Sequence, residues 1–283
     1  MTGSLKVLST GPLTTIQDAG RPGMAAIGVG RSGACDRTSY ELANRLVGNA
    51  PGAAVLEVTY GGLWLRAGGD VLVVTTGARC AGSPAHNAPR WLRAGDEVRL
   101  GTPVTGLRTY VAVRGGLGVE PVLGSCSTDL LAGIGPAVVA AGDVLDVGGE
   151  LGVLPGVDLA AVADPTGGTL TVRVLPGPRR DWFGDGAWDQ LIHRTFAVTS
   201  DCDRVGVRFD GPAIERTRAG ELASEGMVRG ALQVPPSGKP VLLLADHPVT
   251  GGYPVPAYVV DEDVDRCAQL RPGQAVRFRA AGE

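Results

Sequence analysis

The sequence predicts a mainly β protein with a few short helices. Glycine and proline account for 44 and 20 of the 283 residues. That is about 23% together, against a usual share of roughly 12%. Short runs of Val, Leu and Thr alternate with Gly-rich turns, as in β-hairpins. The regular alternation of strands with long helices that marks a βαβ fold is missing, so the pattern indicates a barrel or a sandwich.

The first half contains one expected helix among short strands. The helix is predicted over residues 36–48, because Asp36 can cap its N-terminus and Tyr40, Ala43 and Val47 recur at helical spacing. Gly48 supplies a left-handed stop. The expected strands are 6–8, 55–59, 63–66, 71–75, 97–100, 109–113 and 144–147, with a further short extended piece over 13–23 that ends in a turn.

Residues 151–168 are rich in Gly, Ala and Pro and are interpreted as a linker. The predicted domains are therefore 1–150 and 169–283. The second is expected to contain strands 205–209, 232–234 and 241–245, with helices near 186–194 and 261–270. The acidic run at the start of the last helix favours the positive end of the helix dipole and is interpreted as a solvated cap.

A faint internal repeat supports two related β domains. The strand and Gly-Pro turn of residues 6–12 resemble residues 173–178. The Gly-turn-strand phrase of residues 94–100 returns at 141–147 and 272–278. A similar opening and a similar closing phrase in both halves suggest that the two halves share one architecture.

Charge and hydropathy exclude several functional classes. The chain has 26 basic and 29 acidic residues without a basic stripe, and aromatic residues make up only 5%. Nucleic-acid and anionic-membrane partners are therefore disfavoured. The apolar runs fall far below the roughly 18 residues of a membrane span, and the N-terminus lacks a signal pattern. We expect a soluble cytoplasmic protein.

Familiar catalytic and metal motifs are missing from the sequence. Five widely spaced cysteines without a Cys-x-x-Cys pair argue against a disulfide framework, and three scattered histidines argue against a metal site. Neither a Gly-x-Ser-x-Gly elbow nor a phosphate-binding P-loop occurs. Residues 28–33 have Gly-x-Gly-x-x-Gly spacing, but the surrounding chain does not read as the βαβ unit of a dinucleotide site.

The densest polar group in the first half is the turn that carries Gln17, Asp18, Gly20 and Arg21. Such a turn can direct an amide, a carboxylate and a guanidinium at one small ligand, and arginine can clamp a carboxylate through two hydrogen bonds. The alternative is an Asp–Arg pair that only locks a surface turn.

Two further polar groups follow predicted strands. Arg114 precedes two glycines that permit close backbone approach, and residues 125–129 (Ser-Cys-Ser-Thr-Asp) follow, which suggests an oxyanion or carbonyl site. Ser127 can instead cap a short helix. In the second half, residues 245–254 follow an apolar strand, where binding residues often lie, and residues 224–226 form a similar polar turn.

Longer motifs resemble one family. They comprise residues 14–23, 43–49, 56–57, 61–62, 113–116, 224–226, 233–240, 250–254 and 268–273. Together they resemble the biotin-dependent carboxyltransferase-like family, whose members are also called allophanate hydrolase subunit 2, the 5-oxoprolinase C subunit or the antagonist of the sporulation-kinase inhibitor. The resemblance covers about residues 5–280.

This resemblance implies two tandem cyclophilin-like β-barrel domains. It also implies a partner, the homologue of allophanate hydrolase subunit 1 or of the 5-oxoprolinase B subunit, and a third subunit of the lactam-utilisation type. The implied reaction is ATP-dependent hydrolysis of 5-oxo-L-proline to L-glutamate, and no ATP site is visible in this chain. Two alternatives stay open: a carboxyltransferase of a urea-degrading biotin system, or a non-catalytic regulatory partner of the subunit 1 homologue.

The sequence departs from the family at one motif. Members often have Arg-Gln-Thr before Thr-Gly-Gly-Tyr, whereas this chain has His247-Pro248-Val249. It also lacks a Met-Lys-Met phrase, and its only lysines are Lys6 and Lys239. We therefore expect no covalent biotin on this chain.

The predicted site combines these groups. Activating a lactam carbonyl needs a cation clamp and a carboxylate that handles a proton. We predict Arg21 and Arg114 as clamps and Asp18 as acid or base. The predicted substrate-binding residues are Gln17, Asn44, Glu57, Gly115, Gly116, Ser127, Asp246, Thr250, Gly251, Gly252 and Tyr253.

Overall fold

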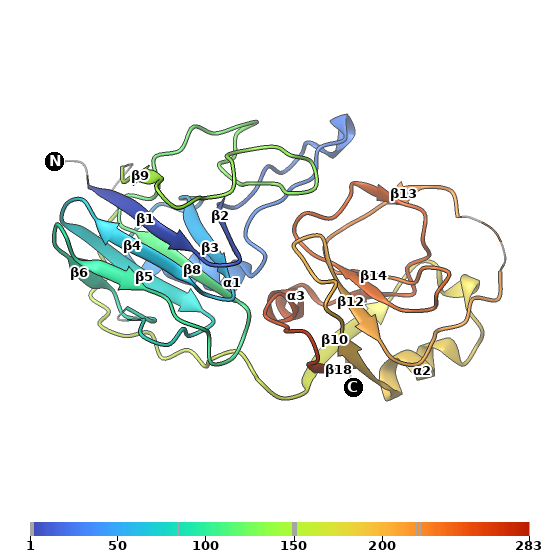
Figure 1. Cartoon of the computed structure of the whole chain (residues 1–283). Helices are drawn as coiled ribbons and strands as arrows, with labels where there is room; N and C mark the ends of the chain where they lie inside the picture. The colour runs from blue at the N-terminus through green and yellow to red at the C-terminus, as the bar shows by residue number, and fades with distance from the viewer. Residues whose placement is uncertain (1–2, 84, 149–151, 219, 221, 283) are drawn as a thin grey trace. The chain divides into compact units, whose positions relative to one another are not determined.

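Figure 1 shows a computed structural model of the chain, which describes residues 3–83, 85–148, 152–218, 220 and 222–282. The chain divides into two compact units. The first comprises Met1–Arg21, Ser32–Asp129 and Gly133–Pro165. The second comprises Pro22–Arg31, Leu130–Ala132 and Thr166–Glu283. Two short stretches of the N-terminal half thus belong to the second unit.

The first unit is built from two antiparallel sheets. One sheet has the order β7 (Glu97–Arg99), β4 (Leu63–Ala67), β1 (Ser4–Thr10) and β9 (Val144–Asp146). The other has the order β2 (Leu13–Gln17), β3 (Val55–Thr59), β8 (Arg108–Val113), β5 (Val71–Gly77) and β6 (Arg90–Leu92). Apolar side chains from both sheets form one buried cluster. The mainly β prediction is confirmed, while a closed barrel in this unit stays a prediction.

The predicted helix is α1 (Arg37–Leu46), and its N-terminal cap is confirmed. The Asp36 carboxylate accepts a hydrogen bond from the Ser39 backbone N–H at 2.9 Å. Its buried residues Tyr40, Ala43 and Leu46 pack with apolar residues of β3, β5 and β8. The helix therefore covers one face of the five-stranded sheet through the apolar stripe that its periodicity predicts.

The second unit contains a closed barrel. Its strand order is β10 (Leu170–Pro176), β17 (Ala257–Val259), β14 (Ala231–Gln233), β15 (Val241–Leu243), β12 (Gly206–Asp210), β11 (Thr195–Val198) and β18 (Ala275–Ala280). Phe278 lies 5.6 Å from Phe196 and 5.5 Å from Phe209 between ring centroids, within the buried core. The barrel predicted for the second half is thus present.

Shorter elements complete the second unit. They are η1 (Ala25–Ile27), η2 (Arg180–Trp182), α2 (Ala187–His193), α3 (Asp261–Cys267), and a two-stranded sheet of β13 (Glu225–Gly226) and β16 (Thr250–Gly251). Asp263 of α3 is 2% exposed and binds Arg173 and Arg266. The interpretation of the acidic run as a solvated cap is therefore wrong at Asp263. Among the described residues, no helix is long and apolar enough to cross a bilayer.

The two copies of the internal repeat pair differently. Residues 6–10 lie in β1 and residues 173–176 in β10, so both copies of the phrase begin in a strand, as the repeat predicts. However, β1 pairs antiparallel with β9, whereas β10 pairs parallel with β18 and closes the barrel. The repeated sequences therefore predict a strand in each half, but they do not determine whether the neighbouring strand runs parallel or antiparallel.

The predicted linker, as far as it is described, lies on the first unit without helix or strand over residues 152–165. The Arg114 guanidinium donates to the Gly152 carbonyl at 2.8 Å, and the Ala160 N–H donates to the Asn87 carbonyl at 2.8 Å. Asp164 forms an ion pair with Arg79 at 3.0 Å. Residue 151, the predicted start, lies outside the described residues.

Limited proteolysis should therefore cut the linker first, between about residues 153 and 159. This stretch lies between two anchored points, and Val153 is 92% exposed. Mass spectrometry of the first fragments identifies the site. A first cut within residues 71–113, which include the buried strands β5 and β8, would contradict this prediction.

The linker contact also predicts a pH-dependent stability. Burial, and secondly the nearby Arg79 cation, lower the pKa of His86, although Asp164 lies 3.5 Å away and opposes the shift. The folded state then holds a neutral His86 at a pH where the unfolded histidine, with a pKa of about 6.5, takes up a proton. The free energy of unfolding should fall as the pH drops below about 6.5.

Urea unfolding at about pH 7.5 and about pH 5.5 measures this loss. His86→Gln should reduce the loss, and the matched change at the exposed His193 should leave it unaltered. Equal pH dependence in the wild type and in His86→Gln would contradict the assignment.

Candidate functional site

Asp18 lies directly after β2, and its carboxylate is held by four donors. Oδ1 accepts from the Ser125 hydroxyl at 2.6 Å, the Ser127 hydroxyl at 2.5 Å and the Gly20 N–H at 2.7 Å. Oδ2 accepts from the Cys126 N–H at 2.6 Å. The side chain is buried, at 6% exposure. Asp18 is therefore a fixed acceptor that organises residues 125–127.

Arg21 is buried, at 1% exposure, so the expectation of a surface turn is wrong at this residue. Its Nη2 donates to the Ser127 carbonyl at 2.6 Å, and its Nε lies 3.4 Å from the Val122 carbonyl. No ion pair joins Asp18 to Arg21 in the described part of the chain. The two side chains instead bind the same segment, residues 122–127, from the same turn.

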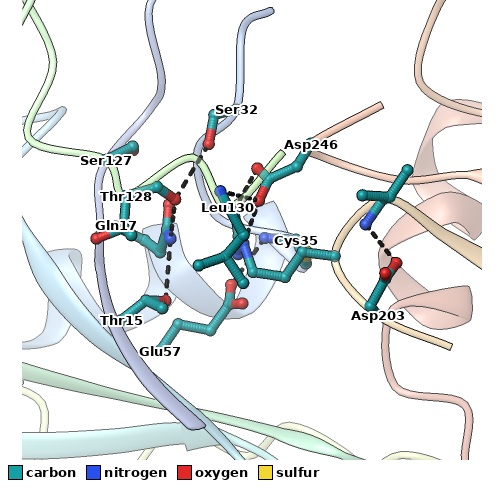
Figure 2. Close-up of polar contacts among 12 residues, drawn as sticks. Thr15, Gln17, Ser32, Cys35, Glu57, Ser127, Thr128, Leu130, Asp203 and Asp246 are labelled. Carbon is teal, nitrogen blue, oxygen red and sulfur yellow. Dashed lines mark hydrogen bonds and ion pairs between the residues drawn. The ribbon is translucent and has the colours of Figure 1, made fainter. Parts of the chain in front are cut away.

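Gln17 directly precedes Asp18 and extends this cluster, and Figure 2 shows its bonds to Thr15 and Thr128. Its Nε2 donates to the Thr15 hydroxyl at 3.0 Å and to the Thr128 carbonyl at 2.9 Å, which also accepts from Ser32 at 3.4 Å. Within the described residues, Arg21 Nη1, Gln17 Oε1 and Thr128 Oγ1 are buried without a hydrogen-bond partner. Because buried polar atoms are normally satisfied, these three atoms mark where water or a ligand can bind.

Ser127 is not a helix cap, which removes the alternative interpretation of that residue. Its hydroxyl donates to Asp18 and accepts from the Asp18 N–H at 3.0 Å. Ser125 and the Cys126 N–H complete the same network and are absent from the predicted site. The short Ser-Cys-Ser sequence was the only local signal, because its partner lies more than 100 residues earlier in the chain.

Arg114 belongs to a second cluster, at the end of α1. Its Nη1 donates to the Val47 carbonyl at 2.9 Å, while Nη2 binds Gly152. The Gly115 N–H donates to Asn49 Oδ1 at 2.8 Å, and Asn49 donates to Asn44 Oδ1 at 2.8 Å. Gly115 has φ +95°, which favours glycine. This cluster therefore joins the helix end to the end of β8.

Glu57 forms a third cluster, inside the five-stranded sheet. It is 1% exposed, and its Oε2 accepts from the Cys35 N–H at 2.9 Å (Figure 2) and from the Tyr110 hydroxyl at 2.7 Å. Arg108 Nε lies 3.5 Å from its Oε1. Burial, followed by the Glu57 charge, raises the pKa of Tyr110 well above its ordinary value. Tyr110 thus remains a neutral hydroxyl donor.

In the second unit, Asp246 is engaged in a buried ion pair. Arg204 donates from Nε to Asp246 Oδ2 and from Nη2 to Oδ1, both at 2.9 Å, and neither side chain is more than 1% exposed. The Leu130 N–H also donates to Asp246 at 3.1 Å, as Figure 2 shows. Asp246 thus joins Leu130 to Arg204 within the second unit.

The last cluster brings together two motifs 25 residues apart. Strand β16 pairs with β13, which aligns Thr250 with Gly226 and Gly251 with Glu225. A Cβ at Gly251 would lie 2.7 Å from Gln233 Nε2, so a larger residue here would require the Gln233 side chain to move. Glu225 is ion-paired with Arg179, and Gly252 and Tyr253 follow, with Tyr253 46% exposed.

The predicted site residues therefore fall into separate clusters within each unit. Gln17, Asp18, Arg21 and Ser127 are brought together, and so are the residues of β13 and β16. The others lie in three separate networks: one holds Arg114, Gly115 and Asn44, another holds Glu57, and the third holds Asp246. The part of the chain that the structure describes contains no group of three or more His, Cys, Asp or Glu side chains that could hold a metal ion.

Comparison with known proteins adds to this geometry. Residues 27–280 match the family model for the carboxyltransferase domain, subdomain A and B. The 5-oxoprolinase C subunit of Escherichia coli is 36% identical over 97% of this chain and 90% of its own length. That of Haemophilus influenzae is 33% identical over 98% and 91%.

A solved structure extends the comparison to a larger protein. The crystal structure of Kluyveromyces lactis urea carboxylase matches with a TM-score of 0.89 and 28% identity. The match covers 97% of this chain but only 27% of that chain. This chain therefore corresponds to about a quarter of the fungal enzyme. On the family model and the similarity to the two 5-oxoprolinase C subunits, the chain belongs to the carboxyltransferase domain family, subdomains A and B.

Proposed function

We propose that this chain is the C subunit of an ATP-dependent 5-oxoprolinase that hydrolyses 5-oxo-L-proline to L-glutamate. The observation that carries the proposal is the 36% identity to a protein named as the C subunit of 5-oxoprolinase, over nearly the whole of both chains. The proposed partner is a homologue of the B subunit, with a third subunit of the lactam-utilisation type. ATP is used by the assembled enzyme and is assigned to no residue here.

The geometry supports different roles for the three predicted catalytic residues. Arg21 keeps a buried donor, Nη1, free of any partner among the described residues, which suits a clamp on a carboxylate or developing oxyanion. The Asp18 carboxylate is occupied by four donors, and Arg114 is bound to two carbonyls. We assign Arg21 to the substrate and assign Asp18 and Arg114 to positioning the segments around it.

A second candidate is a carboxyltransferase component of a urea-degrading biotin system. Relatives named urea amidolyase favour it, such as that of Lachancea kluyveri at 30% identity over 97% of this chain. The match covers only 17% of that protein, so the chain would need further domains as partners. Biotin would have to be carried by another subunit, since Lys239 is ion-paired with Asp210 and the only other lysine is Lys6 in β1.

Reconstitution with two substrate pairs separates these candidates. The chain is co-expressed with its B-subunit homologue, isolated as a complex by size exclusion, and combined with the lactam-utilisation-type subunit. We expect glutamate release from 5-oxo-L-proline with ATP and no carboxylation of urea by a carboxybiotin donor. Separate elution of the two chains, or carboxylation of urea without glutamate release, would contradict the proposal.

A further inference from the structure

The second unit contains a small pocket beside the barrel that none of the predicted site residues lines. It lies between η2 and α2 and has a volume of about 90 Å³. Because about 10–15 Å³ of such space holds one water molecule, the pocket has room for a small organic molecule. The lining residues that matter for recognition are Arg180, Phe183, Asp185, Trp188, Leu191 and Ile214.

Most of the pocket wall is apolar. Phe183, Leu191 and Ile214 are buried, at 7%, 1% and 1% exposure, and belong to the barrel core. Trp188 of α2 is partly buried and packs against the same core. A ring of methylene groups placed here would be removed from water on several sides, which favours binding by roughly 0.8 kcal/mol per buried CH₂.

The polar part of the wall carries one cation and one anion. Arg180 lies over the Trp188 ring, 5.0 Å from its centroid, and Asp185 precedes α2. Within the described residues, neither side chain has an ion pair or a side-chain hydrogen bond. Their neighbours differ: Arg179 is paired with Glu225, and Asp181 with Arg218 at 2.9 Å. Both charges at the pocket are thus without an ion pair among the described residues.

We propose that this pocket is a second binding site, lined by none of the residues of the Arg21 cluster, for a small ring carboxylate that also carries an N–H, and that the lactam of the proposed reaction is its ligand. The guanidinium of Arg180 would bind the carboxylate, and the Asp185 carboxylate would accept from the ring N–H. The methylene carbons would pack on Trp188 and Phe183. The choice of 5-oxo-L-proline as the ligand rests on the proposed function, whereas the ligand class rests on the pocket.

Titration of the full chain with 5-oxo-L-proline tests the pocket directly. Binding is followed by calorimetry and by tryptophan fluorescence, since Trp188 lines the site. We expect saturable binding, with Arg180→Ala weakening it about 10- to 100-fold and Asp185→Asn about 3- to 10-fold. The exposed residues Arg194 and Asp189 supply matched controls, Arg194→Ala and Asp189→Asn, which should bind as the wild type does.

Two comparison ligands define the chemistry. 2-Pyrrolidinone lacks the carboxylate, so the wild type should bind it at least about 10-fold more weakly than it binds 5-oxo-L-proline. Arg180→Ala should bind 2-pyrrolidinone with the same affinity as the wild type does. In Trp188→Phe the fluorescence change should disappear while the calorimetric signal remains. The proposed binding site is overturned if calorimetry detects no binding of 5-oxo-L-proline at millimolar concentration. It is also overturned if Arg180→Ala leaves the binding unchanged.

The outcome for the pocket is separable from the outcome for the function. If the assembled enzyme releases glutamate but Arg180→Ala leaves the binding of 5-oxo-L-proline unaltered, the pocket is wrong and the function stands. If Arg180-dependent binding occurs but no assembled complex hydrolyses the lactam, the function is wrong and the pocket remains a site for small ring carboxylates.

Discussion

Replacing Asp18 with alanine should lower the free energy of unfolding by about 3–4 kcal/mol. The change removes the acceptor of two buried hydroxyls and two backbone N–H groups. Each buried polar group left without a partner costs about 1–3 kcal/mol, and partial entry of water reduces their sum. Urea unfolding followed by circular dichroism measures the loss.

An exposed aspartate supplies the control. Asp158 lies in the linker without a hydrogen bond or ion pair among the described residues, and Asp158→Ala should change the free energy of unfolding by less than about 0.5 kcal/mol. If Asp18→Ala is as stable as Asp158→Ala, the four hydrogen bonds do not organise residues 125–127. Asp18→Asn keeps the shape of the side chain and should lose less stability than Asp18→Ala.

Replacing Arg21 with lysine should lower the turnover of the assembled enzyme about 30- to 1000-fold. Lysine keeps the charge but loses the planar fork, so one ammonium group cannot bind the Ser127 carbonyl and still present a donor at the position of Nη1. Because Arg21 is buried, we also expect a loss of about 1–3 kcal/mol in the free energy of unfolding.

Turnover per folded molecule separates the two effects of Arg21→Lys. The folded fraction of the variant complex is measured by unfolding at the assay temperature, and glutamate release is divided by that fraction. Arg194→Lys alters an exposed arginine of the second unit and supplies the control. Near-normal turnover of folded Arg21→Lys would make the turn a purely structural element.

Local sequence signals predicted the longer elements well. The predicted strand 55–59 has the same bounds as β3, and the Asp36 cap starts α1 where expected. Several short strands were not predicted, and two of them, β6 and β11, begin with Arg-Trp and Thr-Phe without a clear alternation. Strand β6 pairs with β5, and strand β11 pairs with β12 and β18. Pairing with these neighbours, rather than the local sequence, therefore decides that the two segments are strands.

The arrangement of the candidate site was less accessible to sequence reasoning. The chemistry of Gln17, Asp18 and Arg21 was evident from their residue types, but their burial depends on residues 122–128, more than 100 positions away. The same limit explains Arg114, whose side chain turns to the α1 end rather than to Ser127. Asp246 has the expected place after a strand, yet its partner Arg204 lies 42 residues earlier.

The most direct test of the proposed function is 5-oxo-L-proline-dependent ATP hydrolysis by the reconstituted complex, measured with and without this chain. The proposed function predicts that ADP and glutamate form together, only when the lactam is present, and only when this chain is included. Two results would contradict the proposal. One is lactam-dependent ATP hydrolysis that proceeds undiminished without this chain. The other is a complete and monodisperse complex that shows no lactam-dependent ATP hydrolysis.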